Sequence, residues 1–418
     1  MAFHLARTTQ WFALASTLAL SSLAPGCAVD SNGEEENEGA SVDSITSVNH
    51  SEVKRQSIGN CWIYATASWA EALNKSATGV EKNMSESYWT YFHWFEQISN
   101  SGASKISTGG HFATALELIS RYGVLEEGKF IPGEAKAEMS ARQKSANAAI
   151  DASLATGALK TAAARRDRAL VRRELDKAWG LTPAVVANLD AVFGPSVSKT
   201  LDKTAIASGN IMKSSTIKVQ TASATTHQPV NATLADVIGT RSGFGGRSGP
   251  LAWKEVSYPF SKTERRAFEK RYQKALHDKQ PVVMTWFVDF NSLNDKGQFL
   301  APPATPGHQG GHMVVMHDYE IDNVPGFGTL KAGVDETRPA ALAAALDTQA
   351  TIKFIRIKNS WGSFRPDRQF AVPGYHDLHM AYLNGPVARC EENADGSPNT
   401  DDCFDDTPFG GIVLPAGY

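Results

Sequence analysis

Residues 56–62 read Gln-Ser-Ile-Gly-Asn-Cys-Trp, and the interpretation of the whole chain starts from this stretch. It places Cys61 after a turn of small residues, at the start of a helical pattern and before an indole. The first turn of a helix points free N–H groups outward and carries about half a positive charge, so it stabilises a thiolate and lowers the pKa of a cysteine. We therefore predict a nucleophilic thiol at Cys61. A buried structural cysteine is the alternative interpretation.

Apolar periodicity divides the chain into a helical first half and a strand-rich last third. Helical spacing predicts helices over residues 61–73 and 110–122, and the aromatic residues 88–98 between them favour core packing over a ligand site. Three β-branched and aromatic runs bounded by turn formers predict strands, over residues 281–290, 312–321 and 351–358. This order predicts an α+β architecture with two packed lobes.

Residues 134–250 differ in composition from both halves and form a helix-rich insertion in this interpretation. Alanine-rich helix formers fill residues 135–179, and Thr182-Pro183 predicts the start of a further short helix. Arginines crowd residues 165–173, where acidic residues interleave with them. We expect these arginines on a solvated helix face, and a docking surface for an anionic partner is the alternative.

The bulk composition excludes several classes of protein. The chain has 418 residues, of which 42% are hydrophobic and 20% charged, and its net charge is −3. This is ordinary globular composition without the concentrated basic surface that a nucleic-acid partner requires. Four cysteines are too few for a disulfide scaffold or a cysteine-rich zinc site. We expect no metal, no cofactor, no nucleic-acid partner and a monomeric chain.

The N-terminal residues indicate export. Residues 1–27 resemble a signal peptide, with an uncharged stretch over residues 11–24 that ends in a bacterial lipoprotein cleavage box and makes Cys27 the acylated residue. The acidic, polar residues 28–46 predict a flexible tether. We thus expect a lipid-anchored protein of the bacterial outer membrane or cell surface. Ordinary signal-peptidase cleavage, which would give a secreted or periplasmic protein, is the alternative.

Two further cysteines lie near the C-terminus. Cys390 and Cys403 flank an acidic loop. In an exported protein such a pair is expected to form a disulfide.

A thiolate nucleophile needs a base and a group that orients that base. His312 opens an apolar strand after the Gly310-Gly311 turn, which allows a backbone or substrate to approach closely. Asn359 ends the next strand, and its amide oxygen is suited to accept the proton of one imidazole nitrogen and leave the other facing the thiol. Trp361 is placed to cover that contact. Taken alone, Asn359 is better explained as a turn residue.

In chain order these residues resemble the papain-like cysteine peptidases. Five blocks are similar to family motifs and follow the family order: the nucleophile segment, a Leu-Ser-Glu-like turn, a Gly-Gly pair with its helix, the histidine strand and an Asn-Ser-Trp-Gly block, at residues 56–65, 84–86, 109–123, 312–319 and 358–362. The resemblance implies a two-lobed papain-like α+β fold. Its helical lobe would span residues 47–133 and its β-barrel-like lobe residues 251–418, with the helical insertion at 134–250.

The resemblance also implies roles for residues. Cys61 is the nucleophile, His312 its proton partner and Asn359 the orienting amide, while Gln56 and the backbone N–H of Cys61 would form the oxyanion hole. The implied activity is that of a cysteine endopeptidase that hydrolyses a polypeptide through an acyl-enzyme. The family usually spaces its glutamine one residue further from the cysteine, so Gln56 departs from the pattern.

Further expectations concern the substrate cleft. Gly109 and Gly110 would bind substrate backbone beside the cleft, and Trp361 would shield the histidine–asparagine contact there. Residues 134–250 lie between the two half-sites, and we expect a lid that restricts substrate choice. Ile58 replaces a cysteine that forms a disulfide in many family members, and Gly311 stands where Asp or Asn is frequent.

Two alternatives to a peptidase follow from the same residues. A thiol acyltransferase, amidase or transglutaminase-like enzyme would use the same nucleophile with another acceptor. A catalytically silent binding protein would keep the fold without the reaction.

Overall fold

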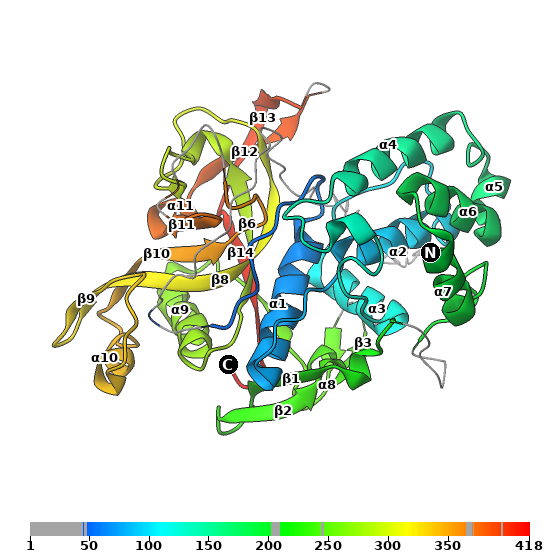
Figure 1. The fold of residues 1–418 in the computed structure, drawn as a ribbon. Helices are drawn as coiled ribbons and strands as arrows, with labels where there is room; N and C mark the ends of the chain where they lie inside the picture. Colours follow the sequence, from blue (N-terminus) through cyan, green and yellow to red (C-terminus); the bar gives the residue numbers. More distant parts are fainter. Residues whose placement is uncertain are drawn as a thin grey trace, which may run out of the picture.

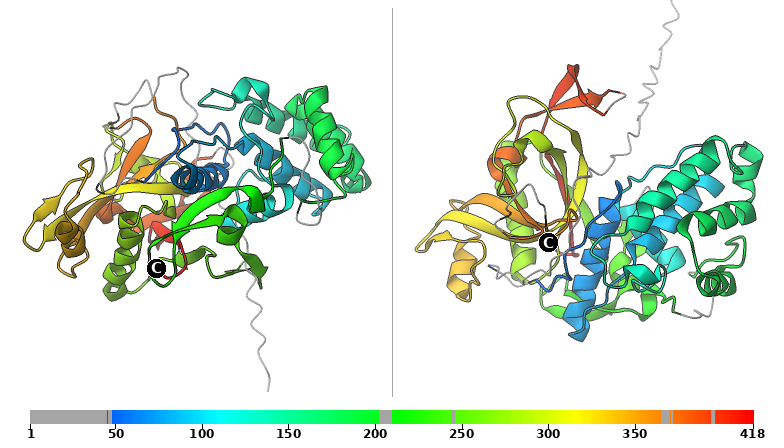
Figure 2. Two further views of the ribbon diagram at one scale, coloured as in Figure 1. Left: turned by 60° about the horizontal axis from the view of Figure 1, so that its bottom comes forward. Right: turned by 45° about the horizontal axis from the view of Figure 1, so that its top comes forward.

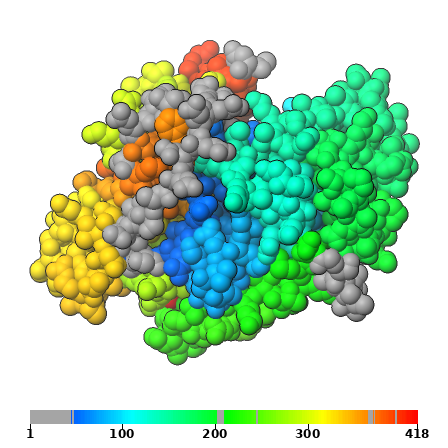
Figure 3. All heavy atoms as spheres, viewed as in Figure 1, coloured from blue at the N-terminus to red at the C-terminus, as the bar shows by residue number. Residues whose placement is uncertain are grey.

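The computed structural model describes residue 45 and residues 48–201, 210–243, 246–364, 370, 372–393 and 396–418. A helical lobe and a sheet-rich lobe lie side by side (Figure 1). Each lobe has a hydrophobic core of its own. The expected α+β architecture is therefore confirmed. On the face shown in Figure 3, the blue segment that includes the first helix surfaces between the yellow and orange sheet lobe and the cyan and green helical lobe.

The helical lobe is built around a long central helix. Its helices are α1 (Cys61–Thr78), α2 (Glu86–Ser99), α3 (Phe112–Tyr122), α4 (Ala141–Ala155), α5 (Ala162–Arg166), α6 (Arg168–Trp179), α7 (Pro183–Phe193) and α8 (Leu234–Ile238), with 3-10 turns η1 (Pro132–Glu134) and η2 (Ser214–Thr216). Most of α1 is buried because it contacts α3 on one side and the sheet of the other lobe on another. The predicted helices are present as α1 and α3, and Gly123 ends α3. The aromatic residues 88–98 lie in α2, where they are buried apart from its polar positions.

Residues 134–250 extend the helical lobe. On α6, Trp179 packs against Trp94 of α2 with the ring centroids 5.2 Å apart, so the two segments share one core. Two hairpins follow: β1 (Lys218–Ala222) with β2 (Pro229–Thr233), and β3 (Thr240–Ser242) with β4 (Gly246–Ser248). The first hairpin contacts α1, and Arg247 of the second hydrogen-bonds to Ala113 of α3. The segment is thus mainly helical up to residue 193, and its later part combines the two hairpins with the short helix α8.

The expectation that these arginines lie on a solvated helix face is wrong for Arg172. This side chain is buried on α6 and forms ion pairs with Asp176 at 2.8 Å and Asp190 at 3.3 Å. The helix α7 supplies Asp190, and this packing was not readable from the charge pattern of α6 alone. A buried guanidinium needs such partners to offset its desolvation.

The second lobe is an open, mostly antiparallel sheet. Its strands are β5 (Lys254–Ser257), β6 (Val283–Asp289), β7 (Gln298–Phe299), β8 (Gln309–Val324), β9 (Gly328–Leu330), β10 (Thr351–Lys358), β11 (Tyr375–His379) and β14 (Phe409–Leu414). The order is β5-β14-β6-β8-β10-β11-β7, with β9 paired to β8. Among the described residues the edge strands β5 and β7 do not pair, so the expected barrel-like lobe is not a closed barrel. The predicted strands are present as β6, β8 and β10.

Three helices and a hairpin complete this lobe. The helices are α9 (Lys262–His277), α10 (Pro339–Ala344) and α11 (Met380–Leu383), with the 3-10 turn η3 (Phe290–Ser292). The hairpin of β12 (Val387–Glu392) and β13 (Pro398–Asp406) projects from the lobe, in red at the top of the right-hand view of Figure 2. A disulfide joins Cys390 and Cys403, which lie opposite each other in this hairpin.

The predictions for the N-terminus lie outside the described residues. They comprise the signal peptide of residues 1–27, the acylation of Cys27 and, apart from residue 45, the tether of residues 28–46. Among the described helices, none is long and apolar enough to cross a membrane.

Candidate active site

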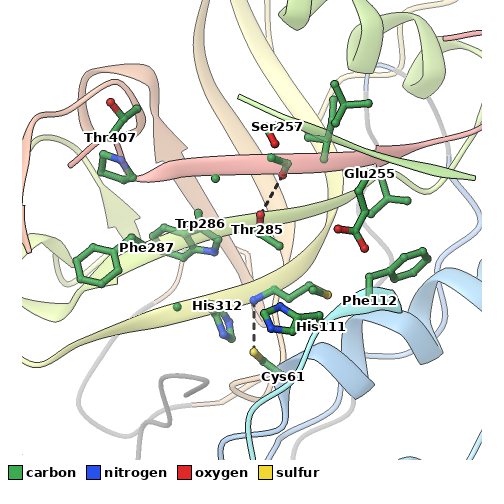
Figure 4. A pocket seen from close by; sticks show the side chains of 18 of the residues that line it. Cys61, His111, Phe112, Glu255, Ser257, Thr285, Trp286, Phe287, His312 and Thr407 are labelled. Atoms are coloured by element: carbon green, nitrogen blue, oxygen red, sulfur yellow. Dashed lines mark hydrogen bonds between the residues drawn. The ribbon is translucent and has the colours of Figure 1, made fainter. Parts of the chain in front are cut away.

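A cleft of about 430 Å³ lies where the two lobes meet (Figure 4). The helical lobe contributes Cys61 and the segment from Gly110 to Phe112 to its lining. The sheet lobe contributes residues of β5, β6, β8 and β14, among them His312. The topology therefore brings the predicted nucleophile and the predicted base, 251 positions apart in the sequence, to one surface.

Cys61 is the first residue of α1, as the sequence predicts. The preceding Asn60 does not cap the helix with its side chain. Instead its Nδ2 donates hydrogen bonds to Thr90 Oγ1 at 3.0 Å and to Gln143 Oε1 at 2.9 Å. Because no side chain of Asn60 occupies the helix start, the dipole and the first N–H groups of α1 remain directed at Cys61 and its surroundings.

The sulfur of Cys61 lies against the histidine strand. Its Sγ accepts a hydrogen bond from the backbone N–H of Met313 at 3.3 Å, and Met313 follows His312 on β8 (Figure 4).

His312 is held by an asparagine and a tryptophan. Its Nε2–H donates to Asn359 Oδ1 at 2.7 Å. Trp361 stacks on the imidazole with ring centroids 4.8 Å apart and planes 25° apart. With Nε2 engaged, Nδ1 has no hydrogen-bond partner among the described residues and is the nitrogen left for the sulfur, beside which the ring lies in Figure 4.

The amide of Asn359 is itself oriented by two contacts. The backbone N–H of Ser360 donates to its Oδ1 at 2.7 Å, and its Nδ2 donates to Nδ1 of His376 at 3.2 Å. These contacts direct the amide oxygen toward His312 and the amide nitrogen away from it. His376 was not predicted from the sequence, because it lies on β11 and reaches Asn359 only through the pairing of β11 with β10. In that pairing it is opposite Ile357.

Burial controls the protonation of His312. Desolvation lowers its pKa to about 4, and the hydrogen bond to Asn359 acts in the opposite direction. A thiolate at Cys61 would favour the imidazolium and raise the pKa of His312.

The structure places Gln56 behind the site. It is buried, its Nε2 donates to the carbonyl of Ile58 at 2.9 Å, and its Oε1 accepts a hydrogen bond from Ser360 Oγ at 2.5 Å. Gln56 is not among the residues that line the cleft. Its contact with Ser360, next to Asn359, links the segment before Cys61 to the Asn-Ser-Trp-Gly block.

The glycine pair is placed at the cleft by Trp62. The indole Nε1 donates to the carbonyl of Thr108 at 2.9 Å, and a Cβ at Gly110 would lie 2.5 Å from the indole ring. Only glycine therefore fits at position 110. Gly110 lines the cleft, whereas Gly109 is buried. Trp361, expected among the substrate-binding residues, is buried against His312 and does not line the cleft.

The expected lid is not found at the cleft. No described residue of 134–250 lines it. The start of this segment instead holds the loop before the nucleophile: the N–H of Arg55 donates to the carbonyl of Glu138 at 2.8 Å, and Ser57 Oγ donates to the carbonyl of Ser140 at 2.6 Å. With the bond between Asn60 and Gln143, these contacts make residues 138–143 a support for the nucleophile loop.

Comparisons with known proteins give similarities of fold only. No protein-family model and no characterised protein matches the sequence. The structure is similar to the Carica candamarcensis cysteine protease CMS1MS2 in complex with E-64, at 13% identity and a TM-score of 0.33, over 88% of this chain and 93% of that chain.

Two bacterial structures are similar to a comparable degree. Xylellain, a cysteine protease from Xylella fastidiosa, has 11% identity and a TM-score of 0.35 over 94% of this chain and 96% of its own. PepW from Lactobacillus rhamnosis HN001 has 11% identity and a TM-score of 0.42 over 90% and 81%. At these values the similarities carry no argument about activity, which rests on the geometry of the site.

Proposed function

We propose that the chain is a papain-like cysteine endopeptidase, in which Cys61 is the nucleophile, His312 the proton carrier and Asn359 the orienting amide. The observation that supports this proposal most is the placement of Nε2 of His312 on Asn359 at 2.7 Å, under Trp361, with Nδ1 left for a sulfur at the start of α1. A histidine that is buried only for packing does not need this arrangement, in which one ring nitrogen is hydrogen-bonded and the other is left without a partner beside a cysteine.

The proposed reaction begins with reduced Cys61. His312 Nδ1 takes the thiol proton, and the thiolate attacks the carbonyl carbon of a peptide bond. The oxyanion that forms lies near the N–H groups at the start of α1. The intermediate collapses when His312 gives its proton to the leaving amine. Water then loses a proton to His312 and attacks the thioester, which releases the new carboxylic acid and restores the thiol.

Peptide hydrolysis by the reduced protein tests the proposal. Peptides blocked at both termini should be cut at internal bonds, and in ¹⁸O-labelled water the new carboxyl group should carry the label. Cys61→Ala and His312→Ala should each lower kcat/KM by about 10³-fold or more, because members of such a unit act together. His308→Ala, in the loop that precedes β8, is the matched control and should leave activity unchanged.

The same assay separates the proposal from its alternatives. If the ¹⁸O label enters the new carboxyl group, and does so only when Cys61 is present, the protein is not an enzyme that can only transfer the acyl group to another acceptor. Products formed only when an amine acceptor is added would indicate an acyltransferase. Absence of any product from reduced, folded protein would contradict the enzymatic proposals.

We also propose that the protein is exported and anchored by a lipid on Cys27. The Cys390–Cys403 disulfide supports an oxidising compartment, since such bonds are rare in the cytosol. The mass of the mature N-terminal peptide tests this proposal. An acylated peptide that begins at Cys27 is expected, and an unmodified N-terminus at another residue would contradict the anchor.

A further inference from the structure

The cleft combines apolar walls with one uncompensated acid. Its apolar lining comes from both lobes and includes Phe112, Val256, Trp286, Met313 and Ile412. Of the charged residues that line it, Arg389 and Asp406 form an ion pair with each other at 3.2 Å. Glu255 also lines the cleft and is exposed, and within the described part of the chain it forms no ion pair.

The strand β5 brings Glu255 to a defined end of the cleft. Glu255 lies opposite Val413 of β14 in the antiparallel pair at the edge of the sheet. Figure 4 shows its carboxylate directed toward His111 and Phe112 of the helical lobe, with Phe287 and Thr407 at the other end of the cleft. The acid therefore faces the space between the lobes.

Two glycines keep the floor of the cleft open beside this acid. Gly410 and Gly411 lie on β14, the strand next to β5, and both line the cleft. A Cβ at Gly410 would lie 2.8 Å from Thr285 Oγ1. Neither glycine carries a side chain. This part of β14 therefore leaves the end of the cleft beside β5 uncovered.

We propose that Glu255 makes the cleft select a substrate with an arginine or lysine side chain close to the scissile bond. The aliphatic stem of such a side chain would lie along the apolar walls, and its cationic head would meet the carboxylate. A mostly apolar pocket with few polar groups derives its specificity from those groups. This inference rests on the proposed peptidase function and names the class of its substrates.

Arginine and citrulline substrates test the selection, because citrulline is a neutral isostere of arginine. Blocked fluorogenic peptides carry one or the other at each of the two positions before the scissile bond. Wild-type protein should cleave the best arginine peptide with a kcat/KM about tenfold higher than its citrulline partner, as expected for one charge-assisted contact. This ratio should fall at high salt, because the acid is exposed.

Variants assign the preference to one residue. Glu255→Gln should bring the ratio to about one while citrulline peptides are cleaved at the wild-type rate, and Glu255→Lys should invert it. Glu264→Gln removes an exposed acid on α9 outside the cleft and should leave the ratio unchanged. A wild-type ratio near one, or an unchanged ratio in Glu255→Gln, overturns this inference while peptide cleavage still stands. Loss of all cleavage in wild-type protein would instead overturn the proposed function.

Discussion

The side chain of Asn60, the residue before Cys61, donates a hydrogen bond to Gln143 of α4 at 2.9 Å. Gln143 is fully buried, and its Nε2 donates to Tyr64 at 3.2 Å and to Ser87 at 3.1 Å. A residue from outside the papain-like motifs therefore fixes the backbone that presents the nucleophile. Residues 138–143 therefore support the loop that presents Cys61.

Gln143→Ala should slow the chemistry at Cys61 and destabilise the fold. The variant removes one of the two hydrogen bonds donated by Asn60 and the one accepted by Tyr64, which costs about 1–3 kcal/mol of unfolding free energy. We expect kcat/KM to fall about tenfold, since a small misplacement of a nucleophile is costly. Denaturant unfolding and peptide hydrolysis measure the two effects. Lys144→Ala, on the exposed side of α4, is the matched control. A kcat/KM equal to that of wild type in a folded Gln143→Ala protein would contradict the link between Gln143 and the chemistry at Cys61.

His376 should act on catalysis only through Asn359. Its Nδ1 accepts the hydrogen bond from the amide nitrogen of Asn359, so His376→Phe removes the contact that keeps the amide oxygen toward His312. We expect kcat to fall about tenfold with KM little changed, because substrate does not touch this residue. His376→Gln retains an acceptor and should recover part of the loss. Equal effects of Phe and Gln on kcat would show that the role of His376 is packing.

A thiolate at Cys61 should raise the pKa of His312. Burial lowers this pKa to about 4, and a thiolate beside the ring would stabilise the imidazolium. NMR titration of the imidazole protons, assigned by loss of the signal in His312→Ala, measures the pKa in wild-type protein and in Cys61→Ala, which has no thiolate. The wild-type pKa should be the higher of the two. Identical titration curves in both proteins would show that no thiolate faces the ring.

The protein should lose stability in acid because two further histidines are buried without charge. Desolvation lowers the pKa of His93 and of His277 to about 4. An unfolded histidine titrates at about 6.5, so between these values the unfolded chain binds more protons and the unfolding free energy falls as the pH drops. Each group contributes at most about 3 kcal/mol over this range. Denaturant midpoints measured at several pH values should show a smaller loss in His277→Gln than in wild type. An equal loss in both would exclude His277 from the effect.

Local patterns were enough to predict the main elements that form the site. The helices after Cys61 and Gly110 and the three strands over residues 281–358 follow from apolar periodicity, which depends only on neighbouring residues. The contact between His312 and Asn359 was also expected from the sequence, because the resemblance to papain-like motifs implies it.

What the sequence did not indicate depends on packing between distant segments. Arg172 is buried because α7 brings Asp190 to it, and His376 reaches Asn359 through strand register. The expected lid is a related case, since no described residue of 134–250 lines the cleft. Composition predicted helices in this segment but carried no information about which face of the first lobe they cover.

Alkylation of Cys61 tests whether this thiol is an activated nucleophile. The rate constant for reaction of the reduced, folded protein with iodoacetamide is measured at about pH 6 and compared with that of free cysteine, with Cys61→Ala showing that the label is on this residue. The account predicts a rate at least about tenfold above free cysteine, because a thiolate beside His312 and the start of α1 persists where a free thiol is protonated. It also predicts that His312→Ala removes this excess. A rate no higher than that of free cysteine, or one that His312→Ala leaves unchanged, would contradict the account.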